Sequence, residues 1–106
     1  MKTEMIDVCG ARFLVIDRTA QRTGDTNFGE INTIEGTISL NEKMPEGVRE
    51  VTLIHEWLHG VFTSNALDHT EQQVGVLSTE LYRQGFRVPR IMPPKHTNKP
   101  KSKRRS

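Results

Sequence analysis

One stretch of the chain constrains the fold more than any other, because it predicts a long amphipathic helix. Residues 45–62 read PEGVREVTLIHEWLHGVF. Pro45 suits the first turn of a helix, and Glu46 suits the positive end of the helix dipole. Gly60 is the first residue that we expect to break the helix. Apolar residues recur at spacings of three and four and predict a stripe that packs on a sheet; they are Val51, Ile54, Leu58 and Val61.

The residues before this helix predict a small antiparallel sheet. In residues 5–17, two apolar runs lie on either side of Cys9 and Gly10, which is the pattern of a tight hairpin or of one bent strand. Cys9 is therefore expected to be a turn or small-core residue rather than a metal ligand or a nucleophile. A second hairpin is predicted for residues 28–32 and 36–40. Together with the helix, these strands predict an α+β fold.

A second helix is predicted to begin near Glu71. Thr70 can cap this helix, and Gln73 stands at the capping-box position. Gly85 is expected to end it, and the prolines that follow prevent its resumption. Its predicted buried stripe consists of Val74, Leu77, Leu81 and Tyr82.

The chain is short, and its charge is unevenly distributed. It has 106 residues, of which 34% are hydrophobic, and this suffices for one small domain with one modest core. Residues 87–106 contain 8 Lys or Arg and no acid, whereas all 13 Asp and Glu precede them. We predict a single minimal domain over residues 1–88 and a disordered basic tail over residues 89–106. The tail is either a solvated terminus or an arm that contacts nucleic acid or an acidic partner.

The composition argues against the membrane and secreted classes of protein. No apolar run approaches the roughly 20 residues that span a bilayer, and the N-terminus lacks the long apolar segment of a secretory signal. The single cysteine cannot form an intramolecular disulfide, which a secreted domain of this size would usually need. We therefore expect a cytoplasmic protein that does not act at a membrane.

The first predicted helix carries a His-Glu-x-x-His pattern. His55 and His59 are four positions apart, so both imidazoles lie on one helix face and can bind one ion. Glu56 is rotated by about 100° from His55 and can lean over the open side of a metal. A zinc hydrolase needs two nitrogen ligands, a third ligand, an open position for water and a carboxylate that accepts a proton from that water. The alternative is a pair of histidines without a metal.

A third metal ligand has to come from beyond Gly60, where four residues are candidates. Glu71 falls in the first turn of the second helix, where an antiparallel return would bring its carboxylate back over the histidines. Glu71 could instead complement the helix dipole. Asp68 and His69 lie in the preceding loop and are the alternatives, whereas Glu80 is expected to point away.

The segments LIHEWLHGVF and EQQVGVLSTELY together resemble the ImmA/IrrE type of metallopeptidase, in particular its small phage and prophage members. The preceding segment, FGEINTIEGTISLNEKM, is also similar to the arrangement in that family, so the resemblance covers roughly residues 28–84. It implies zinc held by His55, His59 and Glu71, with Glu56 as the general base. It also implies the host cytoplasm if the chain is phage-encoded.

Two features depart from the family pattern. Val74 and Leu77 stand where alanine and a phenylalanine-like residue are usual. The second helix is expected to stop at Gly85, without the larger C-terminal part of the family. These departures bear on the substrate more than on the metal.

Two functions are predicted from these features. The first is a zinc-dependent metallopeptidase of the gluzincin type, in which Glu56 is the general base. Tyr82 could donate a hydrogen bond to an oxyanion, and an edge strand at residues 37–41 would hold an extended peptide or protein substrate by strand addition. The second is a catalytically silent, metal-stabilised protein that binds nucleic acid or a host factor through its basic tail.

Overall fold

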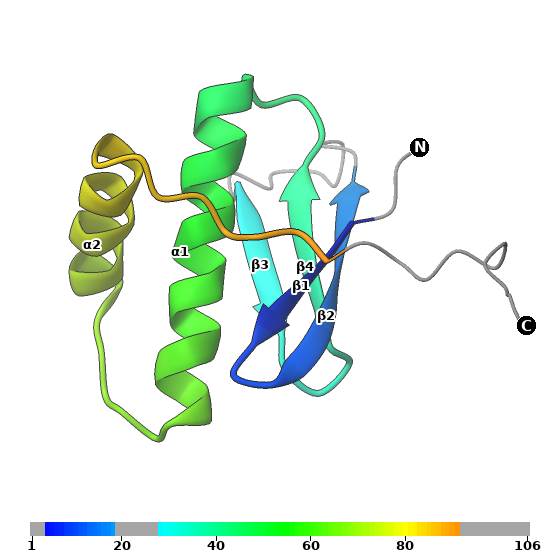
Figure 1. Cartoon of the computed structure of the whole chain (residues 1–106), viewed down its shortest axis with the longest axis vertical. Coiled ribbons are helices and arrows are strands. Elements are labelled where there is room, and N and C mark those ends of the chain that lie inside the picture. The colour runs from blue at the N-terminus through cyan, green and yellow to red at the C-terminus, as the bar shows by residue number, and fades with distance from the viewer. Residues whose placement is uncertain (1–3, 19–27, 92–106) are drawn as a thin grey trace, which may run out of the picture.

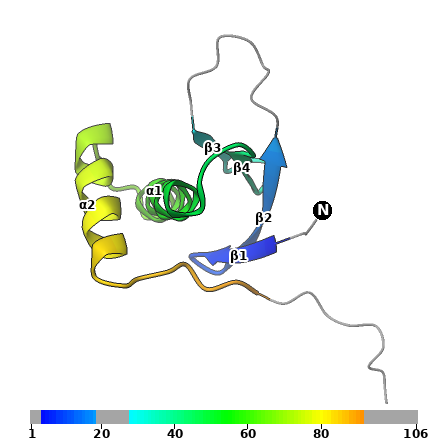
Figure 2. The same cartoon turned by 90° about the horizontal axis from the view of Figure 1, so that it is seen from above.

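The fold is a four-stranded sheet covered on one face by two helices (Figure 1). The computed structural model describes residues 4–18 and 28–91. Figure 2 shows the longer helix lying between the sheet and the shorter helix, which confirms the predicted α+β class. The elements are β1 (Glu4–Val8), β2 (Ala11–Arg18), β3 (Gly29–Asn32), β4 (Thr37–Asn41), α1 (Glu46–Ser64) and α2 (Glu71–Arg83).

The first predicted hairpin is confirmed. Strands β1 and β2 pair antiparallel and are joined by Cys9 and Gly10, whose φ angles are 50° and 92°. Positive φ at both central residues is typical of the two-residue turns that match the twist of a hairpin. The Gly10 amide donates a hydrogen bond to Oδ2 of Asp7 at 3.2 Å. Cys9 is exposed in this turn, so of the two expected positions the turn is confirmed and the small core is not.

The sheet is mixed, whereas the sequence predicted an antiparallel one. Its strand order is β1-β2-β4-β3, with β3 and β4 antiparallel and β2 and β4 parallel. The second hairpin thus inserts its second strand beside β2, with Val15 opposite Ile38. Because β4 is central, Ile38 and Leu40 are completely buried. The edge strand expected at residues 37–41 is therefore wrong, and the edge on that side is β3.

Helix α1 packs on the sheet through an apolar face that the sequence predicted in part. Ile54 and Leu58 are buried as expected, while Val51 and Val61 are only half-buried. Leu53 was not predicted and is fully buried. The core of the described residues consists of Ile6, Val8, Phe13, Val15, Ile38, Leu40, Leu53, Ile54, Leu58, Val74 and Val88.

Gly60 brings α1 close to the sheet and does not end the helix. The helix continues to Ser64, so the predicted break at Gly60 is wrong. A Cβ atom at Gly60 would lie 2.8 Å from Cγ1 of Val8 and 2.9 Å from Cδ1 of Ile31. The missing side chain is therefore a packing requirement, because a methyl group has no room between the helix and these strands.

Helix α2 begins with the predicted capping box. The Thr70 hydroxyl accepts a hydrogen bond from the Gln73 amide at 3.0 Å, and the Gln73 side chain accepts one from the Thr70 amide at 2.9 Å. The helix ends at Arg83, just before Gly85, which has a φ of 96°. Its buried face differs from the predicted stripe, because the helix turns Ser78 inward and leaves Leu77 41% exposed.

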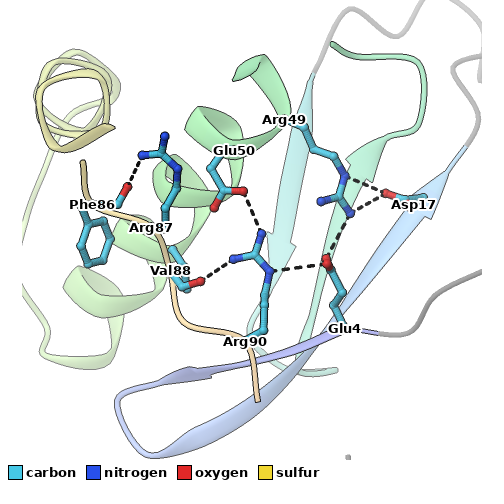
Figure 3. Close-up of polar contacts among 8 residues, drawn as sticks. All are labelled: Glu4, Asp17, Arg49, Glu50, Phe86, Arg87, Val88 and Arg90. Carbon is cyan, nitrogen blue, oxygen red and sulfur yellow. Dashed lines mark hydrogen bonds and ion pairs between the residues drawn. The ribbon is translucent and has the colours of Figure 1, made fainter. Parts of the chain in front are cut away.

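Residues 86–91, which we call the strap, cross from the end of α2 to β1. Figure 3 shows the Arg90 guanidinium between Glu50 of α1 and Glu4 of β1, at 2.8 Å and 3.5 Å from their carboxylate oxygens. Val88 is buried, and the Ile91 amide donates a hydrogen bond to the Met5 carbonyl at 2.7 Å.

The described fold therefore extends three residues beyond the boundary expected at residue 88. The remainder of the predicted basic tail, residues 92–106, lies outside the described residues. Neither described helix combines the length and the apolar character that a bilayer crossing requires.

Candidate metal centre

The two histidines of the motif lie side by side on α1. His55 and His59 are one helical turn apart, and their ring centroids are 4.9 Å apart in an edge-to-face arrangement. Both rings are half-buried, on the part of α1 that α2 overlies. The regular helix thus fixes the separation of the two imidazoles before any metal is bound.

Glu71 completes the group from the start of α2. One of its carboxylate oxygens lies 3.0 Å from Nε2 of His55, and the other lies 2.9 Å from Nε2 of His59. The capping box fixes the start of α2 and thereby the position of this first-turn residue. Burial is the largest single effect and opposes ionisation, but hydrogen bonding and charge from the two histidines together outweigh it, so the pKa of Glu71 is lowered. The structure thus brings together the two motif histidines and the predicted third residue.

This donor set suits a metal ion. One ligand atom from each of the three side chains lies within 4.8 Å of the others. Two imidazole nitrogens and a carboxylate oxygen are ligands that zinc accepts, and three protein ligands leave a fourth position open in a tetrahedral site. Burial and the neighbouring imidazoles lower the pKa of His59, although the negative charge of Glu71 acts in the other direction. The lowered pKa favours the neutral imidazole, which is the form that binds a metal.

Glu56 is the buried acid of the site. Its side chain is 7% exposed, and no other residue among those described forms a hydrogen bond or ion pair with it. Burial, together with the negative charges of Glu71 and Glu30, raises the pKa of Glu56 to about 7. A carboxylate with a pKa near neutrality can both accept and return a proton.

These side chains line one cleft between β3 and the two helices, with a volume of about 730 Å³. Its floor is α1, and its walls come from the edge strand and from α2. Among the described residues that line it there is no lysine or arginine; they are Phe28, Gly29, Glu30, Ile31, Thr33, Val51, Thr52, His55, Glu56, His59, Thr63, Glu71, Gly75, Ser78 and Thr79.

The other predicted candidates lie away from the cleft. Asp68 lines a separate groove, and Glu80 pairs with Arg83 on the surface at 2.9 Å. Tyr82 is not a lining residue of the cleft, and the Arg87 guanidinium lies over its ring, 4.0 Å from the ring centroid. The structure therefore does not bring Tyr82 to the reacting position that the sequence suggested.

His69 approaches the site without joining the group of three. Its Nε2 lies 2.9 Å from Nδ1 of His59, on the side of that ring away from Glu71. Its own Nδ1 lies 3.0 Å from the Leu67 carbonyl. The sequence offered His69 only as an alternative ligand, and a spacing of ten residues from His59 carries no signal for such a contact.

Glu30 is a residue of the cleft that the sequence did not point to. It stands on the edge strand β3, lines the cleft and raises the pKa of Glu56. Its local pattern is that of an ordinary polar position in an alternating strand, so only the pairing of the strands places it beside the helix motif.

Comparison of the chain with known protein families, with curated proteins and with solved structures returned no match.

Proposed function

We propose that the protein is a zinc-dependent metallopeptidase. The observation that carries the proposal is the convergence of three potential ligands, His55, His59 and Glu71, beside the buried acid Glu56, which has no hydrogen-bond or ion-pair partner among the described residues. If the cluster had only a structural role, Glu56 would be unfavourable there, because a buried acid without a partner destabilises the fold at neutral pH. The phage-type resemblance of the two motifs points to the same reaction.

The reaction would use the residues of the cleft in separate roles. A zinc ion bound by His55, His59 and Glu71 would activate water and polarise the peptide carbonyl. Glu56 would accept a proton from the attacking water and return it to the leaving amine. Its raised pKa suits both steps, because the group must be ionised first and protonated later.

The edge strand β3 offers a place for an extended peptide. The Asn41 amide donates to the Phe28 carbonyl at 2.9 Å, and Glu30 stands opposite Ser39 in the same register. In an antiparallel pair, every second residue of a strand forms backbone hydrogen bonds with the neighbouring strand. Phe28 and Glu30 are on the side that faces β4, so the backbone N–H and C=O groups of Gly29 and Ile31 point away from β4. Both residues line the cleft, so a peptide could pair with them by strand addition.

The test compares wild type with Glu56→Gln on a peptide library analysed by mass spectrometry. We expect wild-type protein loaded with zinc to cleave peptides, and Glu56→Gln to bind zinc equally well but to lose cleavage. Glu46→Gln is the matched control, because Glu46 is exposed and does not line the cleft. Zinc binding without cleavage by the wild type would favour the silent, metal-stabilised binding protein instead.

A further inference from the structure

His69 connects the candidate metal centre to the loop between the two helices. Its Nε2 lies 2.9 Å from Nδ1 of His59, and its Nδ1 lies 3.0 Å from the Leu67 carbonyl oxygen. Both nitrogens of this ring therefore have partners within hydrogen-bond distance. Neither remains free to bind a metal in this arrangement, which separates His69 from the group of three.

The direction of these two hydrogen bonds follows from their chemistry. A carbonyl oxygen can only accept, so the Leu67 contact places the proton of a neutral His69 on Nδ1. Nε2 of His69 is then the acceptor, and Nδ1 of His59 must donate to it. The network thus assigns to neutral His59 the tautomer that carries its proton on Nδ1.

This tautomer leaves a lone pair on Nε2 of His59, the atom that faces Glu71. That nitrogen lies 2.9 Å from Oε2 of Glu71, which is also an acceptor. Two acceptors at this distance repel each other unless a proton or a metal ion lies between them. We call the two hydrogen bonds that link Leu67, His69 and His59 the relay. The relay thus keeps His59 in the form that a metal requires, before a metal is present.

The position of His69 is itself fixed by its surroundings. Its ring packs against Phe62 of α1, with centroids 5.1 Å apart. The residue that follows, Thr70, is held by the capping box of α2. His69 is thus restrained on both sides, by the side of one helix and by the start of the next.

We propose that His69 is a positioning residue, which orients His59 and selects its metal-binding tautomer by accepting its Nδ1 proton. The proposal rests on the metal centre described above, but not on peptide hydrolysis. His69 therefore acts on metal affinity through His59, and its removal should weaken binding by about 10- to 100-fold, the range usual for the partner of a ligating histidine.

Three variants of the full-length chain separate this role from a merely structural one. In His69→Gln, the side-chain oxygen can reach the position of Nε2 and still accept from His59. In His69→Asn, the shorter amide can keep the Leu67 contact but cannot reach His59. His69→Ala removes both contacts, and His96→Ala is the control for loss of a histidine elsewhere in the chain.

The measurement is the zinc dissociation constant, from competition with a chromophoric chelator. We expect His69→Gln and His96→Ala to stay within about threefold of wild type, and His69→Asn and His69→Ala to bind about 10- to 100-fold more weakly. Circular dichroism in excess chelator checks that the variants fold. Wild-type affinity in His69→Asn, or equal losses in His69→Gln and His69→Asn, would overturn the proposal.

A second readout needs no metal. Proton–nitrogen correlation spectra of the metal-free wild type should show neutral His59 protonated at Nδ1, and His69→Ala should lose this preference. Protonation at Nε2 in the wild type would contradict the relay. A wild type that binds no zinc would remove the metal centre itself, whereas one that binds zinc but cleaves nothing would leave the role of His69 standing.

Discussion

Oε2 of Glu71 lies 2.9 Å from Nε2 of His59, so the first turn of α2 is tied to the middle of α1. The contact is made by an exposed residue, since the Glu71 side chain keeps 77% of its accessible surface. An exposed carboxylate has little packing to hold it in place. Its position over the histidines therefore depends on the capping box behind it and on its contacts with the two imidazoles.

Substitution of Glu71 tests whether it is a ligand. Glu71→Ala should lower zinc affinity by orders of magnitude, because only two ligands from one helix remain. Glu80→Ala is the matched control, since Glu80 lies on the same helix and its side chain pairs with Arg83 and Gln84. Isothermal titration of both variants with zinc measures the difference. Retained zinc in Glu71→Ala would reduce Glu71 to a helix-dipole residue worth at most about 1 kcal/mol of stability.

The buried acid predicts a pH dependence of stability in the metal-free protein. The pKa of Glu56 is about 7 in the fold and 4.5 as a free side chain, so the fold favours the protonated form. The stabilisation is complete below pH 4.5 and is lost as the pH rises through 7. Glu56→Gln should therefore exceed wild type in unfolding free energy at pH 8, by up to about 3 kcal/mol, and much less at pH 5.

Urea unfolding in excess chelator measures this effect at the two pH values. Glu46→Gln serves as the control, because Glu46 is exposed in the first turn of α1. Equal differences between wild type and Glu56→Gln at pH 5 and pH 8 would show that Glu56 is not buried as an acid.

The close approach of α1 to the sheet gives a packing prediction. Gly60→Ala should lower the unfolding free energy by about 1 kcal/mol or more, because overpacking against Val8 and Ile31 outweighs the better helix propensity of alanine. Gly75→Ala on α2 is the matched control, since nothing lies within 4 Å of the added Cβ. That variant should gain up to about 1 kcal/mol in chemical denaturation. Stabilisation by both substitutions would mean that α1 can move away from the sheet.

The ion pair that holds the strap gives a second prediction of stability. Arg90→Ala should cost about 2–3 kcal/mol of unfolding free energy, because it leaves the buried Glu50 carboxylate without its partner. Arg83→Ala removes an exposed ion pair with Glu80 and should cost less than about 1 kcal/mol. Thermal unfolding of the two variants compares them directly. Equal stability of the two would show that Glu50 is satisfied by solvent instead.

The parts of the fold that local pattern governs were predictable from the sequence. The turn at Cys9 and Gly10 needs residues that accept positive φ, and the capping box of Thr70 and Gln73 needs only four consecutive residues. The proximity of the two motif histidines was also predictable from local pattern, because helical spacing alone places them on one face. Prediction of Glu71 as the third residue of the group required one further assumption, that α2 runs back along α1. Figure 1 shows this return of α2.

The features that could not be predicted from the sequence depend on how the helices and strands pack against one another. The central place of β4 follows from its pairing with β2, a choice that neither hairpin encodes. Local sequence rules predict that a glycine such as Gly60 ends a helix, but here it lies within α1 and allows the helix to approach the sheet closely. His69 likewise gains its role from a ring ten residues earlier, and Ser78 is buried because α2 rotates it toward α1.

The parallel pairing of β2 with β4 has a consequence for the time course of folding. Residues such as Val15 and Ile38 meet only after a long segment closes, and pairings of this kind form slowly. The three candidate ligands instead lie on two helices that are neighbours in the chain. A metal ion can therefore join α1 to α2 while the sheet is still open, and zinc should accelerate refolding in stopped-flow fluorescence of Trp57 rather than only slow unfolding.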